Sequence, residues 1–323
     1  SREPSERQSL STFRTMGSTH AGVVVGAGVP LVAYDTRIVG GVEIPELNGA
    51  RFTFIAGVFS ILAILCYLIC YVLVTERVIP EPVERSKSGG VKRLIVGAVT
   101  NRALISIIVA SILMLLSQFT LQQMANYVFP DYYANTTAQS ASTIAMMGGM
   151  IVAAILARPL SEKFGKAEIS VWSNLLAAGV CLLLFFIRPQ NVWVYVGVNV
   201  ISWLGLGVFA MVNWALITDV IDYSEIKNGI REDGSIYAMY SFARKIGQAA
   251  AAGVTGLLLT VIGYEKVEGV PLPSGVKEGI FSLSTLVPAI GFILLSAVLW
   301  FWYPLHKRQV DKNVEILREK HAK

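Results

Sequence analysis

Two adjacent cations, Arg244 and Lys245, lie near the middle of a long apolar segment of the chain. A charged side chain at the centre of a membrane span costs roughly 2.5–3.5 kcal/mol on insertion scales, unless it faces a cavity or a partner. Lys245 lies about ten residues, roughly 15 Å, from the expected inner end of this segment, which is too far for its amine to reach the membrane surface. We therefore expect Lys245 to line a path for a polar solute.

The same segment carries further polar residues at helical spacing. In an α-helix, four of them share one face and two border it. The face is formed by Tyr237, Ser241, Lys245 and Gln248, and the border by Tyr240 and Arg244. This arrangement indicates that one side of the segment is polar along about three turns.

An earlier apolar segment carries a second polar stripe, formed by Gln118, Gln122 and Asn126 at positions i, i+4 and i+8. Such side chains can hydrogen-bond between helices, at about 0.6 kcal/mol per contact, or they can offer donors and acceptors to a polyhydroxylated solute. Both interpretations stay open from the residues alone. Arg14 lies closer to an expected membrane edge, where reaching the surface is the simpler interpretation.

Three acids, Asp219, Asp222 and Glu225, follow one another at i, i+3 and i+6 near the expected cytoplasmic end of an apolar segment. They could be catalytic carboxylates, a metal site, a solvated helix end, or an acidic patch that pairs with cations elsewhere and breaks when a gate opens. Acids at a helix C-terminus oppose the helix dipole, so we expect cationic partners for them. The candidates are Arg231, Arg2 and Arg7.

The composition indicates which elements hold these residues in place. Of the 323 residues, 54% are hydrophobic and only 15% are charged, against about 25% charged in soluble domains. Apolar residues gather into runs near 20 residues long, which is the length needed to cross a bilayer core of about 30 Å. The sequence therefore predicts an all-α polytopic membrane protein. The three cysteines lie inside these runs without ligand-spaced companions, so we expect no metal site.

Eight spans are predicted. With both ends of this chain on the cytoplasmic side, 20 of the 27 lysines and arginines fall on inside segments and 5 on outside loops. This bias strongly favours that orientation, and it places the basic residues in short loops rather than in a nucleic-acid groove. The expected spans are Ser11–Tyr34, Phe52–Val74, Arg102–Phe129, Gln139–Ala157, Ser170–Ile187, Val192–Thr218, Ser235–Ile262 and Glu278–Tyr303.

The charged loop before the seventh span contains a distinctive series, which reads Asp219-Val-Ile-Asp222-Tyr223-Ser-Glu225-Ile-Lys227, Gly229-Ile-Arg231 and then Lys245-Ile-Gly247. This series resembles the signature of the glycoside–pentoside–hexuronide cation symporters of the major facilitator superfamily. The opening residues 1–7, followed by Arg14, are similar to the family's entry into its fifth helix. The likeness runs the length of the chain, but specific motifs are confined to these stretches and to Gly263-Tyr264.

The resemblance implies a chain that begins at the fifth and ends at the twelfth of twelve helices, a fragment without the first four. It implies two helices of the N-terminal bundle in residues 1–74, a cytoplasmic middle linker in 75–101, a C-terminal six-helix bundle in 102–303 and a cytoplasmic tail in 304–323. Such carriers bind substrate near the midplane and rock two halves around it. The family's cation-binding acids would belong to the absent helices.

The resemblance also implies roles for single residues. Lys245 matches a lysine in the sugar and cation region, Ser241 a small hydroxyl residue beside the sugar, and Arg14 a sugar-site arginine. The cytoplasmic ion-pair lock between the halves would comprise Asp219, Asp222, Glu225 and Arg231.

Three positions depart from the best-known family member. Ala210 stands where that member has a sugar-stacking tryptophan, with Trp214 one turn further on, and Gln123 and Met124 replace an aromatic pair. Arg244 adds a second positive charge beside Lys245, which would favour an anionic substrate such as a hexuronide or a sulfonated sugar.

The sequence therefore predicts a secondary active transporter, not an enzyme, that couples Na⁺ or H⁺ to movement of a glycoside, pentoside or hexuronide by alternating access. We expect a monomeric multi-pass carrier in the plasma (inner) membrane, with a sugar, a coupling cation and the lipid bilayer as partners, no nucleic acid and no cofactor beyond the co-transported cation. The alternatives are an efflux pump or lipid carrier of the same fold, which would need a wider apolar cavity, and, less favoured, an intramembrane enzyme. The expected solute contacts are Arg14, Gln118, Gln122, Asn213, Trp214, Ser241 and Lys245.

Overall fold

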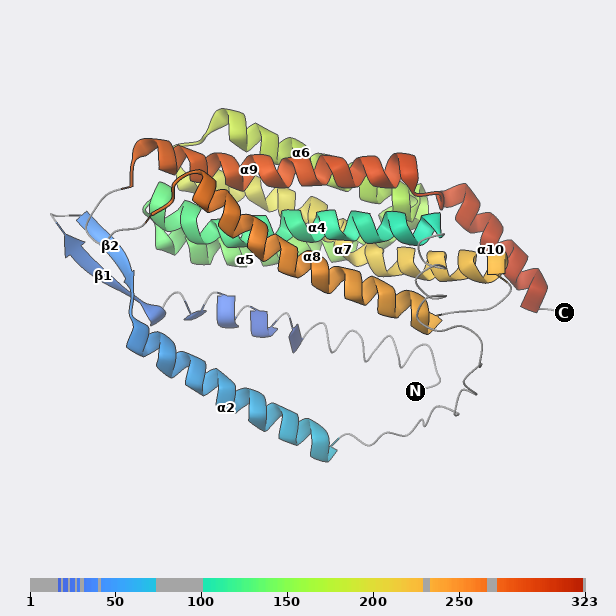
Figure 1. Ribbon diagram of the computed structural model, residues 1–323, viewed down its shortest axis with the longest axis horizontal. Helices are drawn as coiled ribbons and strands as arrows, with labels where there is room; N and C mark the ends of the chain where they lie inside the picture. Colours follow the sequence, from blue (N-terminus) through green and yellow to red (C-terminus); the bar gives the residue numbers. More distant parts are fainter. Residues whose placement is uncertain are drawn as a thin grey trace. The chain divides into compact units, whose positions relative to one another are not determined.

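The computed structural model describes residues 17–18, 20–22, 24–26, 28–29, 32–39, 42–73, 101–228, 233–265 and 272–321 (Figure 1). Arg14 and Arg231 lie outside these residues, as do 11 of the 24 residues of the first expected span. The chain divides into two units. One comprises residues 1–88 with 139–144, and the other comprises 89–138 with 145–323. The boundaries expected from the sequence for bundles, linker and tail stay a prediction.

The first unit contains a β-hairpin that the sequence analysis did not predict. Strand β1 (Tyr34–Val39) pairs antiparallel with β2 (Val42–Leu47), with Tyr34 opposite Leu47. We expected the end of a span and a loop here. Two runs with β-branched residues separated by a glycine pair are a known hairpin signal, which the apolar pattern of the preceding residues had obscured. The hairpin is a small addition to a chain that is otherwise helical in its described part.

Helix α2 (Gly49–Leu73) follows the hairpin and corresponds to the second expected span. The side chain of Asn48 accepts a hydrogen bond from the backbone N–H of Arg51 at 3.1 Å, which caps the start of the helix. None of its residues is buried in the first unit, although the helix is apolar on all sides. A helix of this kind needs lipid or other helices around it.

The second unit is a bundle of long helices. Its elements are α4 (Arg102–Tyr127), η1 (Val128–Tyr132), the remainder of α5 (Thr136–Phe164), α6 (Lys166–Ile187), α7 (Val192–Asn228), α8 (Asp233–Val261), α9 (Ser274–Ala297), η2 (Val298–Trp302) and α10 (Lys307–His321). Helix α4 packs against α8 and α9, and α6 packs against α7 and α9 (Figure 1). The short terminal helix α10 contacts α6 and α7.

Six helices of the described residues are long and apolar enough, by length and composition, to cross a membrane. They correspond to six of the eight expected spans, which confirms an all-α polytopic membrane protein. Helix α8, which we expected to be the seventh span, is 29 residues long and is not among the six. The physical reason is its polar content, since Arg244, Lys245 and Gln248 occupy its centre. Its place in the membrane stays a prediction.

Glycines set how closely α7 and α8 approach their neighbours. A Cβ atom on Gly247 of α8 would lie 3.3 Å from Cγ1 of Ile112 on α4, so only a glycine allows this spacing without adjustment. A Cβ on Gly205 of α7 would collide with the backbone oxygen of Ser173 on α6. These contacts bring backbones together as small residues do between membrane helices, and they set how closely α8 approaches α4 and α7 approaches α6.

Candidate functional site

A buried polar network links α4, α7 and α8 in the apolar interior of the second unit. The Ser111 hydroxyl lies 3.0 Å from the Tyr240 hydroxyl and 3.3 Å from Oδ1 of Asn213. The Asn213 side-chain amide also donates to the Tyr240 hydroxyl. All three residues are 1% exposed or less. Buried polar groups that satisfy one another rigidify their surroundings, so this network holds three helices in one register.

Aromatic rings and Arg244 extend this network toward the surface of the second unit. The indole of Trp214 stacks on the Tyr237 ring, with 6.0 Å between centroids and 19° between planes. It meets the Tyr240 ring edge to face at 5.5 Å. The guanidinium carbon of Arg244 lies 5.3 Å from the Trp214 centroid and 5.9 Å from that of Tyr240. Trp214 and Tyr237 keep 42% and 38% of their surface exposed, so both rings remain accessible.

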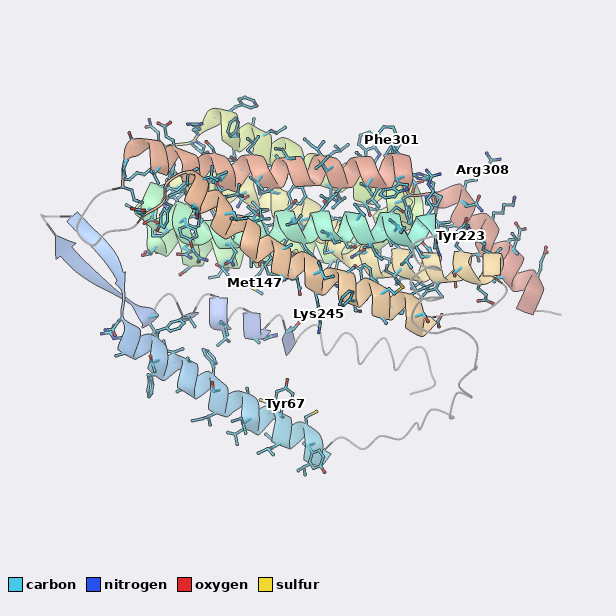
Figure 2. All side chains as sticks on the ribbon, viewed as in Figure 1. Tyr67, Met147, Tyr223, Lys245, Phe301 and Arg308 are labelled. Carbon is cyan, nitrogen blue, oxygen red and sulfur yellow. The ribbon has the colours of Figure 1, made fainter. Side chains whose placement is uncertain are left out.

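Lys245 and Ser241 lie on the exposed face of α8, one turn apart. Figure 2 shows Lys245 projecting from α8 on the side away from α4. Among the described residues, no carboxylate lies within 4 Å of either Lys245 or Arg244. Were α8 to span the membrane as expected, this face would border protein or water, because an uncompensated lysine cannot face lipid cheaply. The roles of both residues stay predictions.

Gln118 and Gln122 lie on α4 and are half-buried. They follow Ser111 after two and three turns on the same helical face. In the part of the chain that the structure describes, neither amide has a hydrogen-bond partner. Asn126, the third member of the stripe, does have an interaction partner, so both interpretations left open by the sequence stay predictions. A role toward a solute stays a prediction.

The acidic series at the end of α7 has a partner that the sequence analysis did not name. Nζ of Lys166, at the start of α6, lies 2.6 Å from Oδ1 of Asp219. The Asp219 side chain is only 7% exposed, whereas that of Lys166 is 34% exposed. We expected Arg231, Arg2 or Arg7, all of which lie outside the described residues. Sequence patterns within one helix carry no information on a cation 53 residues away on another.

The other members of the expected gate are only partly described. Glu225 is buried and Asp222 is half-buried at the same end of α7, and both have interaction partners. Among the residues that the structure describes, Oδ2 of Asp219 is buried and has no hydrogen-bond partner. The carboxylate of Asp219 can therefore accept one more donor on that oxygen.

A second charged cluster fixes α10 beside this end of the bundle. Oε1 of Glu168 accepts a hydrogen bond from the backbone N–H of Lys307 at 3.0 Å and lies 3.4 Å from Nδ1 of His306. The Lys307 amine donates to the carbonyl oxygens of Glu162 and Lys163 at 3.0 and 2.8 Å. Together these contacts tie the α5–α6 junction to the start of α10.

Sequence reasoning missed Ser111 and Lys166, and it named Tyr240 only as a border residue of the polar face of α8. A signal existed for Ser111, which continues the Gln118–Gln122 stripe toward the start of its helix. No signal within the sequence points from Lys166 to Asp219. Among the described residues, no group of three or more His, Cys, Asp or Glu side chains is placed to hold a metal ion.

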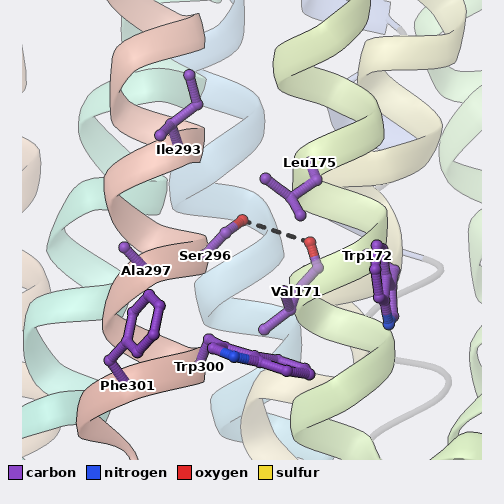
Figure 3. Close-up of a pocket in the computed structure, with 8 residues that line it drawn as sticks. All are labelled: Val171, Trp172, Leu175, Ile293, Ser296, Ala297, Trp300 and Phe301. Carbon is purple, nitrogen blue, oxygen red and sulfur yellow. Dashed lines mark hydrogen bonds between the residues drawn. The ribbon is translucent and has the colours of Figure 1, made fainter.

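A groove of about 280 Å³ lies between α6 and α9 (Figure 3). Its chemistry differs from that of the cluster formed by Trp214, Tyr237, Tyr240 and Arg244 on α7 and α8. The hydroxyl of Ser296 donates to the carbonyls of Val171 and Phe292 at 3.3 and 2.8 Å, and the rest of the lining is apolar apart from the indole N–H groups of Trp172 and Trp300. An apolar surface of this kind suits lipid chains rather than a sugar. It is lined by Val171, Trp172, Leu175, Ile293, Ser296, Ala297, Trp300 and Phe301.

Comparisons with known proteins give one family and several relatives. The family model described as MFS/sugar transport protein matches residues 1–307. An uncharacterized symporter of Bacillus subtilis is 27% identical over 98% of this chain and 66% of its own length. A putative sulfoquinovose importer of Salmonella typhimurium is 27% identical over 99% and 65%. An isoprimeverose transporter of Lactiplantibacillus pentosus is 28% identical over 99% and 64%. The chain thus spans slightly under two thirds of the length of these relatives.

Proposed function

This chain belongs to the MFS/sugar transport protein family, and on that premise we propose that it moves a sugar or glycoside across a membrane as a secondary active transporter. The family match confirms the likeness to the glycoside–pentoside–hexuronide symporters seen in the charged loop and in α8. The solute would be a glycoside, pentoside or hexuronide, and movement would be coupled to Na⁺ or H⁺. The relatives named for the transport of isoprimeverose and sulfoquinovose support a small sugar as the solute.

The observation that carries this proposal is the cluster of Trp214, Tyr237 and Arg244 above the buried polar network. Sugar sites combine an aromatic face for the ring with a few fixed polar groups for the hydroxyls. Trp214 and Tyr237 supply accessible rings, whereas Asn213 is 1% exposed and acts beneath them through its hydrogen bonds with Ser111 and Tyr240. Further polar groups would come from Gln118, Gln122, Ser241 and Lys245, with Arg14 from outside the described residues.

The charged end of α7 would serve as the cytoplasmic gate. Alternating access requires contacts that form in one state and break in another. The pair of Lys166 with Asp219 lies within one unit, and Oδ2 of Asp219 has no hydrogen-bond donor among the described residues. We propose that this oxygen, with Asp222 and Glu225, accepts cations such as Arg231 in the state closed to the cytoplasm. The coupling cation would bind elsewhere in the full-length carrier.

The lipid-carrier alternative is less well supported. A carrier of apolar solutes needs a broad apolar cavity on its transport path. The apolar groove lies between α6 and α9, whereas the cluster on α7 and α8 is polar and cationic. The carrier would be a monomeric plasma-membrane protein with both ends of this chain in the cytoplasm, as the placement of basic residues supports.

The test is gradient-driven uptake into vesicles that contain the full-length protein. Labelled neutral glycosides and hexuronides are offered with an imposed Na⁺ or H⁺ gradient to wild type, Lys245→Ala and Lys312→Ala. Lys312 is an exposed residue of α10, so its replacement removes the same charge outside the expected site. We expect uptake of at least one sugar under one gradient, abolished by Lys245→Ala and retained by Lys312→Ala. Absence of uptake for every sugar under both gradients would refute the proposed function.

A further inference from the structure

Arg244 and Lys245 place two positive charges at one depth of α8 without a described counter-charge. The acid of α8 itself, Asp233, lies eleven residues before Arg244. Helix α4, which packs along α8, contains no acidic residue at all. The acid of α7 nearest in sequence to Trp214 is Asp219, and it already pairs with Lys166. Within the described residues, the site therefore has a net charge of two positive units.

A pair of cations in a membrane-spanning protein costs several kcal/mol unless an anion accompanies it at least part of the time. Two sources of that anion are possible in principle, namely a carboxylate from another part of the protein or the solute. The contacts of Arg244 favour the solute. Its guanidinium is held over the rings of Trp214 and Tyr240, in the same cluster that offers accessible aromatic faces to a sugar.

The cluster also orients Arg244. Tyr240 is fully buried and is fixed through its hydroxyl by Ser111 and Asn213, so the ring beneath the guanidinium cannot move freely. Contact with aromatic faces leaves the in-plane N–H donors of a guanidinium available. Such donors match a carboxylate or sulfonate in a bidentate manner, with shorter and stronger bonds than neutral groups make. The site thus combines a ring platform with an oriented anion receptor.

We propose that Arg244 is the residue that selects the solute, and that this solute is an anionic sugar whose carboxylate or sulfonate binds the guanidinium while its ring lies on the Trp214–Tyr237 pair. This inference rests on the proposed transport function and narrows its substrate class. Lys245, on the adjoining face of α8, adds a second positive charge to the field that attracts the anion. Tyr240 is a positioning residue, because it acts on the solute through Arg244.

The test compares two solutes that differ in charge at one position, 4-nitrophenyl β-glucuronide and 4-nitrophenyl β-glucoside, with sulfoquinovose as the sulfonated probe. Binding affinity and uptake are measured on the full-length protein for wild type, Arg244→Gln and Arg244→Lys. We expect wild type to prefer the anionic sugars. Arg244→Gln should weaken glucuronide or sulfoquinovose binding by about 10- to 100-fold, the value of a charge-assisted hydrogen-bonded pair, and change glucoside binding by less than about threefold. Arg244→Lys should weaken the binding of the anionic sugars less than Arg244→Gln does, because it keeps the positive charge.

Several outcomes would overturn the inference. Equal loss of neutral and anionic sugars in Arg244→Gln would assign Arg244 to a structural ion pair. The inference would also be overturned if the wild-type protein took up the neutral glucoside with no preference for the anionic sugars. This outcome needs no variant, so the test stands even when Arg244→Gln does not fold. In both cases sugar transport itself would survive. Failure to transport any of the sugars would instead refute the proposed function.

Discussion

The buried ion pair between Lys166 and Asp219 allows one stability prediction to be worked out from the contacts. The Lys166→Met substitution keeps most of the side-chain volume and removes the charge. Asp219 then loses the partner of Oδ1, and its Oδ2 already lacks a hydrogen-bond partner within the described part of the chain. A carboxylate that is 7% exposed would be left with neither oxygen satisfied. Leaving one partner of a buried pair alone costs about 3–5 kcal/mol.

The exposure of Lys166 lowers this value. Its side chain is 34% exposed, so water reaches the pair and screens the attraction. We therefore expect Lys166→Met to reduce the free energy of unfolding by about 2–3 kcal/mol, just below the range for fully buried pairs. Replacing both partners, as Lys166→Met with Asp219→Leu, should recover most of this loss, because no buried charge remains. The double-mutant cycle should yield a coupling energy of about 2 kcal/mol.

The assay is denaturant-induced unfolding of the purified full-length protein in detergent, followed by its helical circular dichroism signal. Lys163→Met is the matched control, because Lys163 is an exposed lysine three residues earlier whose side chain makes no ion pair with the described residues. This control should shift stability by less than about 0.5 kcal/mol. The reasoning is refuted when Lys166→Met is no more destabilising than Lys163→Met, or when the coupling energy is near zero.

Two further predictions concern the buried polar network and the packing of α7 against α6. Tyr240→Phe keeps the ring and removes the hydroxyl, which leaves the buried side-chain amide of Asn213 without one of its partners. We expect the free energy of unfolding to fall by about 1–3 kcal/mol. An unchanged denaturation midpoint would contradict the proposed role of this hydrogen-bond network. Gly205→Ala should lower the yield of folded protein in size-exclusion chromatography, because the new methyl group meets the backbone of α6. Gly197→Ala in the same helix, where no heavy atom lies within 4 Å of the new carbon, should leave the yield unchanged, and equal losses in both variants would contradict this account of the packing.

Much of the fold follows from local patterns in the sequence. Apolar runs of the right length predicted the helices now seen at α2, α4, α5, α6, α7 and α9, because the bilayer core sets a minimum length for a span. The helical period placed Ser241 and Lys245 together on a single face of α8, and the structure leaves that face exposed. The hairpin of β1 and β2 escaped prediction, although the glycine pair between the strands is a local signal.

The candidate site depended much more on tertiary structure. Asn213 and Trp214 were singled out as neighbours of a solute, but their contacts with Ser111, Tyr237, Tyr240 and Arg244 join residues from three helices.

The sequence by itself determined the membrane class, most of the helices and the presence of two cations on α8. Only the tertiary structure decided that Arg244 lies against Trp214 and that Lys166 is the partner of Asp219. The physical reason is that helical periodicity and hydrophobic length act within one segment. Which faces of two segments meet depends on packing, here on the close approach that Gly205 and Gly247 allow.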